Sequence, residues 1–198
     1  MWYVLRNLIK SLSPIVDCGV HYIDVMCQMV RSRPVQVSAI GARLTNDIPE
    51  GNYNYGQLQI RFEDGSVGWY EAGWGPMISE TAFFVKDVIG PEGSVSIVAK
   101  DAGGAGKSDS IEAHTKTESL RWHRASIDAN NAFTQQDDWI DLTDEPDHQE
   151  LCNREQAYFM KAIQDDIDLT DHVEDAVNSL RIAFACDESV RTGEVVKL

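Results

Sequence analysis

The 198-residue sequence has little basic charge and no long hydrophobic run. It contains 17 Lys and Arg against 32 Asp and Glu, a formal net charge of −15 at pH 7. Because basic side chains that neutralise phosphates supply much of the affinity for nucleic acid, this deficit argues against a nucleic-acid partner. The longest stretch without charge, Pro34 to Ala42, is far shorter than the ~20 apolar residues of a membrane span. Residues 1–15 lack the apolar run and cleavage site of an export signal. We expect a cytoplasmic protein without a membrane partner.

Cysteine is also scarce, and its spacing follows no recognisable pattern. Cys18, Cys27, Cys152 and Cys186 form no C-x-x-C pair and fit no common zinc or disulfide framework. We therefore expect four reduced thiols that pack as small hydrophobic residues.

Motifs for nucleotide binding and for common hydrolases are missing. No G-x-G-x-x-G follows a predicted strand, and neither G-x-S-x-G nor H-E-x-x-H occurs. Residues 101–108 approach the phosphate loop G-x-x-x-x-G-K-[ST], but Asp101 replaces its first glycine and no obvious helix follows. We predict a flexible glycine-rich loop there.

What the sequence does contain is a run of strands between helices. Apolar and polar residues alternate most strictly over 57–63, and Asp64-Gly65 suits a hairpin turn. Strands are predicted at 35–40, 57–63, 66–74, 83–89, 94–98, 110–113, 119–123 and 195–196, helices at 17–30, 150–164 and 171–191 (with Thr170 as N-cap), and an acid-rich solvated loop at 136–150. This order predicts one α+β domain over residues 1–198, an open, mostly antiparallel sheet with helices packed on one face.

A narrow polar stripe marks the first predicted helix. Asp17, His21, Asp24 and Gln28 follow one another at intervals of four, three and four residues, which places them on one face of an α-helix. The other positions are almost all apolar, and the helix carries no cation. Histidine titrates near neutrality, and a carboxylate one turn away can fix its tautomer and stabilise its charged form. The stripe therefore indicates proton transfer.

Two alternatives stay open for this stripe. An Asp–His contact can simply satisfy a buried helix, because structural ion pairs also perturb titration. Asp and His one turn apart can also share a metal ion, but no further His or Cys cluster supplies the remaining ligands. The other histidines, His114, His123, His148 and His172, are isolated in sequence and are expected to be structural or exposed.

The residues of the stripe also resemble a known family. Ser13 to Asp24 is similar to the D-x-G-x-H-x-x-D segment that opens the C-terminal domain of the Gfo/Idh/MocA oxidoreductases, named after glucose–fructose oxidoreductase, inositol dehydrogenase and a rhizopine catabolism protein. Segments 58–74, 88–97, 159–163 and 175–196 follow the family's order. The resemblance therefore covers nearly the whole chain from about Pro14.

The resemblance implies a fold and a mechanism. Intact members have an N-terminal Rossmann domain for NAD or NADP and an α+β domain for the substrate. Carried over, His21 takes the proton from a substrate hydroxyl while hydride passes to the nicotinamide, beside a lysine from an E-K-P motif of the first domain. Asp17 orients His21 or holds the substrate, and Asp24 supports them. The family's sheet commonly forms oligomer contacts, so a dimer or tetramer is expected.

The sequence departs from the family pattern before Asp17. Only 16 residues precede it, and both the glycine fingerprint and the E-K-P lysine are missing. We therefore expect that the NAD(P)-binding domain is absent and that this chain alone binds neither a nicotinamide cofactor nor a metal. The chain is expected to be the substrate-binding and oligomerising half of an oxidoreductase acting on a sugar or cyclitol hydroxyl, inactive by itself. The alternative is a non-catalytic oligomeric module that keeps the fold.

Overall fold

The computed structural model describes residues 7–77, 86–97, 117 and 119–198. The chain divides into two compact units, Met1–Ile78 with Asp168–Leu198, and Ser79–Ile167. The first unit is thus built from both ends of the chain, and the second from the segment between them. None of the helices in the described part has the length and apolar character needed to cross a membrane. The expectation of a single domain over residues 1–198 stays a prediction.

A four-stranded antiparallel sheet organises the first unit. Its strands, in the order in which they pair, are β3 (Val67–Gly73), β2 (Tyr55–Phe62), β1 (Pro34–Ala42) and β8 (Val196–Lys197). Alternate side chains of β2 are buried, as its alternating sequence predicts. One face of the sheet is therefore available for packing against helices.

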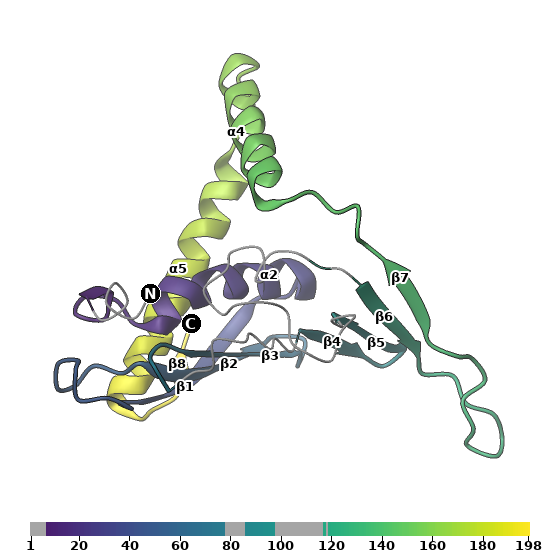
Figure 1. Ribbon diagram of the computed structural model, residues 1–198, viewed down its shortest axis with the longest axis horizontal. Coiled ribbons are helices and arrows are strands. Elements are labelled where there is room, and N and C mark those ends of the chain that lie inside the picture. The colour runs from purple at the N-terminus through teal and green to yellow at the C-terminus, as the bar shows by residue number, and fades with distance from the viewer. Residues whose placement is uncertain (1–6, 78–85, 98–116, 118) are drawn as a thin grey trace. The chain divides into compact units, whose positions relative to one another are not determined.

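Helices of the first unit cover that face (Figure 1). The first helical segment on this face is a π-helical turn, η1 (Ile15–Gly19), which continues directly into α2 (Val20–Val30). Helix α2 packs against α5 (Thr170–Thr192). The shared core consists of Ile15, Val16, Ile23, Val37, Ala39, Leu58, Ile60, Phe62, Ile182, Ala183 and Cys186. Burial of each large apolar side chain contributes about 1.5–3 kcal/mol, so this core holds η1 and α2 firmly on the sheet.

The second unit contains another four-stranded antiparallel sheet. Its strands, β4 (Asp87–Gly90), β5 (Gly93–Ile97), β6 (Ser119–Arg124) and β7 (Asp138–Asp141), pair in chain order. Helix α4 (His148–Gln164) follows them. It is capped by Asp147, whose carboxylate accepts a hydrogen bond of 2.8 Å from the backbone N–H of Glu150.

The predicted fold class is confirmed as α+β with antiparallel sheets, although the strands divide into two sheets rather than one. The strands predicted at 35–40, 57–63, 66–74, 94–98, 119–123 and 195–196, and the helices predicted at 150–164 and 171–191, all correspond to observed elements. The predicted loop at 101–108, the strand at 110–113, the first residues of the strand at 83–89, and His114 lie outside the described residues.

Two local predictions were wrong, and a third differs only in where its helix begins. Residues 136–150 contain β7, because four residues pair there with β6 despite their acidity, and α4 begins at His148. Thr170 is not the N-cap, which is Leu169. Instead Asp168 accepts hydrogen bonds from the backbone N–H and the hydroxyl of Thr170 (2.9 and 2.6 Å). The helix predicted from residue 17 begins two residues earlier, as a π-turn.

Candidate functional site

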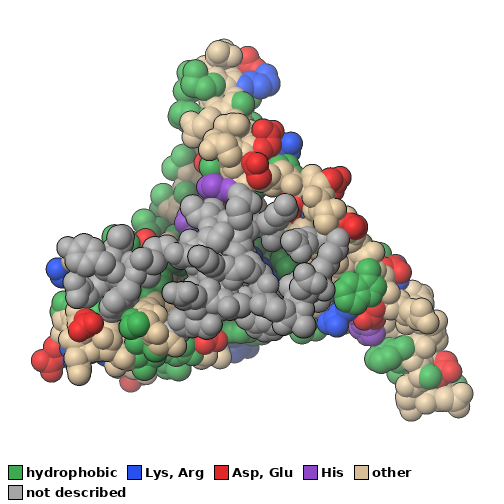
Figure 2. Space-filling view, viewed as in Figure 1, with side chains coloured by type: hydrophobic (Ala, Val, Ile, Leu, Met, Phe, Trp, Pro, Cys, Tyr) green, Lys and Arg blue, Asp and Glu red, His purple; other side chains and the backbone are tan. Residues whose placement is uncertain are grey.

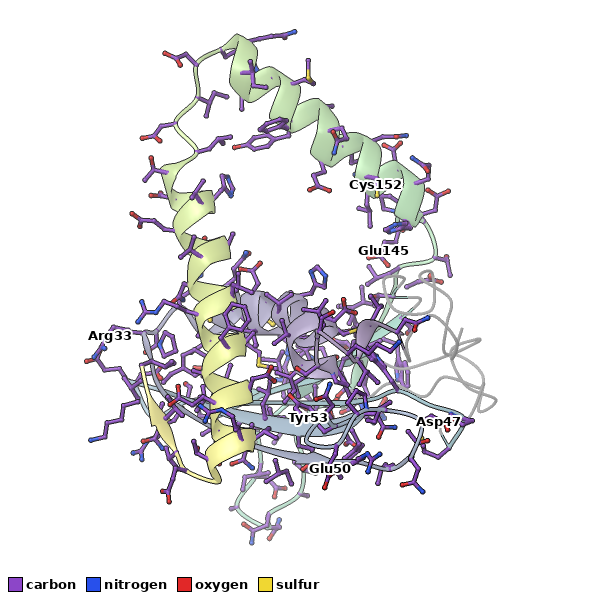
Figure 3. The ribbon with its side chains drawn as sticks, turned by 90° about the vertical axis from the view of Figure 1, so that its left-hand side faces the viewer. Arg33, Asp47, Glu50, Tyr53, Glu145 and Cys152 are labelled. Atoms are coloured by element: carbon purple, nitrogen blue, oxygen red, sulfur yellow. The ribbon has the colours of Figure 1, made fainter. Side chains whose placement is uncertain are left out.

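Asp17 is positioned by a polar network that reaches α5. The Ser13 hydroxyl accepts a hydrogen bond from the backbone N–H of Val16 (3.1 Å) and donates one to Asp187 (2.7 Å). The Tyr53 hydroxyl donates to the same carboxylate, and Figure 3 shows Tyr53 beside α5. The backbone N–H of Asp17 donates to the Ser13 carbonyl (3.0 Å). The network therefore fixes the turn that carries Asp17.

The Asp17 carboxyl group lies beside a thiol and an aromatic ring of β3. The Cys18 thiol donates to Asp17 Oδ2 at 3.4 Å. Burial, followed by the charge of Asp17, raises the pKa of Cys18 to about 12, while a hydrogen bond from Trp74 opposes the rise. Burial also raises the pKa of Tyr70, with contributions from Cys18 and Asp17. Cys18 and Tyr70 are therefore neutral at pH 7 and can act as hydrogen-bond donors.

Two tyrosine rings border the same turn. Tyr22 of α2 stacks on Tyr70 with centroids 4.9 Å apart and an interplanar angle of 23°. A Cβ at Gly19 would lie 3.1 Å from Cε1 of Tyr70, so the glycine of the D-x-G-x-H segment lets the ring approach the helix closely. π-turns occur frequently at functional sites. Here the π-turn, the glycine and the stacked rings converge within one turn of Asp17.

Among the described residues, no hydrogen bond or ion pair joins Asp17, His21 and Asp24 to one another. Asp24 accepts hydrogen bonds from Ser179 of α5 (3.1 Å) and from Gln28 (3.0 Å). His21 is exposed and, among the described residues, makes no hydrogen bond or ion pair with either carboxylate. The predicted stripe assumed a regular α-helix, whereas the π-turn closes its hydrogen bonds one residue later and changes the angular spacing around Asp17. The roles assigned to His21, Asp17 and Asp24 stay predictions.

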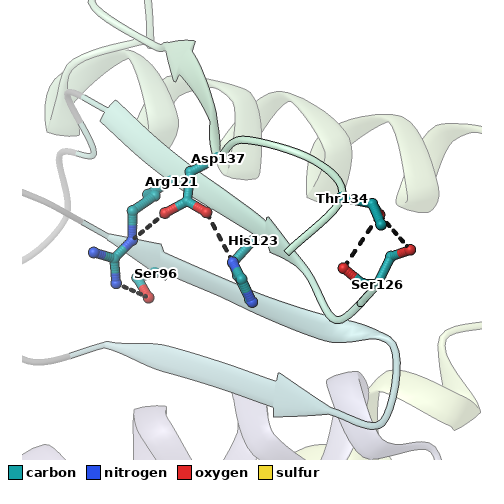
Figure 4. A network of polar contacts seen from close by, with 6 residues as sticks. All are labelled: Ser96, Arg121, His123, Ser126, Thr134 and Asp137. Carbon is teal, nitrogen blue, oxygen red and sulfur yellow. Dashed lines mark hydrogen bonds and ion pairs between the residues drawn. The ribbon is translucent and has the colours of Figure 1, made fainter. Parts of the chain in front are cut away.

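A second polar cluster lies in the second unit, around Asp137 (Figure 4). His123 Nδ1 is 2.8 Å from one oxygen of Asp137, and Arg121 Nε is 3.8 Å from the other. Arg121 also donates to the Ser96 hydroxyl at 3.5 Å. Strand pairing brings these residues together across 14 to 25 positions of sequence, so no local motif could reveal the cluster. It ties the connection between β6 and β7 to the sheet.

The described residues contain no group of three or more His, Cys, Asp or Glu side chains that could hold a metal ion. On α4, His148 and Cys152 lie one turn apart, with 3.6 Å between Nε2 and Sγ. All four cysteines are free, and Cys186 is buried. Burial raises the pKa of Cys27 to about 11 and that of Cys186 to about 12.

The sequence of the chain matches one protein family over nearly its whole length. Residues 2–198 match the Gfo/Idh/MocA family described as "Oxidoreductase family, C-terminal alpha/beta domain". The chain belongs to this family. The D-x-G-x-H-x-x-D segment of this Gfo/Idh/MocA domain is the part that forms η1 and the start of α2. Among curated proteins none matches the sequence.

Solved structures of oxidoreductases share the fold of this Gfo/Idh/MocA domain. Aldose–aldose oxidoreductase from Caulobacter crescentus, complexed with glycerol, has a TM-score of 0.65 at 16% identity and covers 93% of this chain and 47% of its own. Levoglucosan dehydrogenase in complex with NADH and levoglucosan has a TM-score of 0.65 at 18% identity, and the match covers 92% of this chain and 49% of the dehydrogenase. Myo-inositol dehydrogenase from Corynebacterium glutamicum has a TM-score of 0.58 at 23% identity, and the match covers 98% of this chain and 52% of the dehydrogenase. The likeness shows the fold, and this chain spans about half the length of each of these structures.

Proposed function

We propose that this chain is the substrate-binding and oligomerising half of an NAD(P)-dependent oxidoreductase that acts on a hydroxyl of a sugar or cyclitol and is inactive alone. The observation that carries the proposal is the Asp17 carboxyl group on a π-turn of a Gfo/Idh/MocA domain, beside Cys18 and the Tyr22–Tyr70 pair. Among the described residues Asp17 makes no ion pair with Lys or Arg, which suits a neutral polyol better than an anionic substrate. The three similar structures, complexed with glycerol or named for levoglucosan and inositol, support this class.

The residues then have distinct roles. His21, exposed on α2, takes the proton from the substrate hydroxyl as the carbonyl forms. Asp17 accepts a hydrogen bond from the substrate and holds it. Asp24 is engaged by Ser179 and Gln28, so it positions α2 against α5. NAD or NADP, bound by the other half of an intact enzyme, supplies the acceptor for the hydride.

We also propose a cytoplasmic homo-oligomer, a dimer or tetramer formed through the sheets. In the second unit, strand register aligns Val88, Val95 and Trp122 on one face, and these side chains are 51%, 37% and 41% exposed. Hydrophobic side chains reach the surface among many acidic ones in Figure 2. Exposed apolar patches of this kind mark protein–protein contacts. Size-exclusion chromatography with light scattering should show an oligomer, and a clean monomer contradicts this part of the proposal.

Binding measurements test the substrate role on the chain as it exists. In ¹H–¹⁵N spectra, myo-inositol should produce saturable shifts at Asp17, Gly19 and His21. NADH, followed by its fluorescence, should show no saturable binding. Tight NADH binding contradicts the proposal that the cofactor is bound by the other half of the enzyme. Unchanged spectra across a panel of neutral sugars and cyclitols contradict the proposed substrate role.

A non-catalytic oligomeric module is the second candidate. The observation in its favour is that, among the described residues, no hydrogen bond or ion pair joins His21 to Asp17. This candidate predicts an oligomer whose ¹H–¹⁵N spectrum does not change when any of the polyols is added.

A further inference from the structure

The ring of Tyr70 is fixed in place next to the Asp17 turn. Tyr70 lies on β3 opposite Leu58, on the face of the sheet that the helices cover. Its ring packs against Gly19, where a Cβ would lie 3.1 Å from Cε1, and stacks on Tyr22 at 4.9 Å. A side chain held on two sides in this way presents its hydroxyl in one direction with little loss of entropy on binding.

The Tyr70 hydroxyl has no partner in the part of the chain that the structure describes. No hydrogen bond joins it to a residue within the described ranges. Among these residues, the buried side-chain polar atom without a hydrogen-bond partner is Arg121 Nε, not the Tyr70 oxygen. The hydroxyl therefore retains contact with solvent, unlike that of Tyr53, which donates to Asp187.

A donor and an acceptor lie in the same neighbourhood here, since the pKa of Tyr70 is raised by burial and also by the charge of Asp17. Burial and the neighbouring acidic groups raise the pKa of Tyr70, so its phenol keeps its proton and donates. The Asp17 carboxyl group, two residues before the glycine that the ring touches, offers an acceptor. A ligand that fits both must accept one hydrogen bond and donate another, as two hydroxyls on adjacent carbons do.

We propose that Tyr70 is a ligand-binding residue of the Asp17 site, donating a hydrogen bond to one hydroxyl of a neutral vicinal diol whose neighbouring hydroxyl donates to Asp17. This inference rests on the proposed function, because it assumes that Asp17 meets the substrate. It adds a residue outside the D-x-G-x-H-x-x-D segment, and it limits the ligands to those with adjacent hydroxyls.

The test is a titration of the isolated chain with myo-inositol, followed in ¹H–¹⁵N spectra and by the Cζ signal of ¹³C-labelled tyrosine. Tyr70→Phe keeps the ring and removes the donor, so binding should weaken by a factor of roughly 3 to 10, the worth of one net hydrogen bond. Tyr55→Phe is the matched control. It removes a hydroxyl from the opposite face of the same sheet, where that hydroxyl donates to Glu71 at 2.8 Å, and should leave binding unchanged.

The outcomes separate the two claims. A shift of the Tyr70 Cζ signal with bound myo-inositol, together with weaker binding by Tyr70→Phe, supports the inference. In a second outcome, the wild type binds myo-inositol, Asp17→Asn loses binding, and Tyr70→Phe binds as well as the wild type. Tyr70 then has no role in binding, and the proposed function stands. If the wild type gives no saturable shift with any vicinal diol, both are overturned. The Phe variant's own spectrum shows whether it folds, and the Cζ signal of the wild type tests the contact independently of that variant.

Discussion

Ser13 and Asp187 are 174 residues apart in the sequence and joined by a hydrogen bond of 2.7 Å. The bond links the serine whose hydroxyl accepts from Val16 of the π-turn to the second half of α5. Since Tyr53 donates to the same carboxylate, three distant segments of the first unit meet at one half-buried acid.

Removal of that acid should destabilise the first unit. Asp187→Ala leaves the hydroxyls of Ser13 and Tyr53 without their acceptor, and an unsatisfied buried donor costs about 1–3 kcal/mol. Urea denaturation, monitored by circular dichroism, measures the loss. Glu188→Ala, at the next and exposed position of α5, is the control and should change the free energy of unfolding by less than about 0.5 kcal/mol. Equal effects of the two changes contradict the network.

The β4–β5 turn should tolerate alanine at one glycine and not at the other. A Cβ at Gly93 would lie 1.9 Å from the carbonyl oxygen of His123, and its φ of +145° strains any L-residue. A Cβ at Gly90 meets nothing within 4 Å. Gly93→Ala should therefore lower the melting temperature or prevent folding of the second unit, whereas Gly90→Ala should leave the melting temperature nearly unchanged. Equal melting curves for the two variants rule out the contact.

Stability should fall in alkaline solution because of one buried and two half-buried thiols. Burial raises the pKa of Cys27 from 9.0 to about 11, so the folded state keeps a proton that the unfolded state releases. The stabilisation is complete below pH 9 and disappears as pH rises through about 11. Cys18 and Cys186 act in the same direction up to about pH 12. The urea midpoint should fall from pH 9 to 11, and less steeply in Cys27→Ala; a flat wild-type profile contradicts the assignment.

The same burial should protect three thiols from alkylation. At pH 7 only a minute fraction of Cys18, Cys27 and Cys186 exists as reactive thiolate, because their pKa values are raised to about 11 or 12. Iodoacetamide should label these sites far more slowly in the native chain than in urea, as peptide mass spectrometry can measure. Cys152, half-buried on α4, serves as the internal comparison and should react first. Rapid native labelling of Cys186 contradicts its burial.

Local pattern predicted much of this fold. The alternation over 57–63 specified both the strand and its buried face, because side chains of a strand point to opposite sides in turn. Strand β7 could not be predicted from its acid-rich composition. It forms because its residues pair with Leu120 and Trp122 of β6, which is a long-range contact. The division into two sheets was equally invisible, since it depends on long-range pairing.

The candidate site shows where sequence spacing fails. The spacing was interpreted for a regular α-helix, whereas residues Ile15–Gly19 form a π-turn, which the sequence spacing does not reveal. The π-turn depends on tertiary contacts: Ser13 is held by Asp187, and Gly19 packs under Tyr70. The β3 segment alone does not show that Tyr70 packs against Gly19, because that contact joins two segments far apart in the sequence.

Synthesis on the ribosome gives the pairing of β1 with β8 a kinetic consequence. The first unit takes the inner strand β1 from the first part of the chain and its last strand, Val196–Lys197, from the final residues. One edge of β1 therefore stays unpaired until α5 and β8 have been synthesised, which happens only after the whole second unit. During that time Val37 and Ala39 are not yet covered by α5. A nascent chain should thus complete the second unit before the first, although the first begins earlier, and premature termination should leave an edge strand open to aggregation.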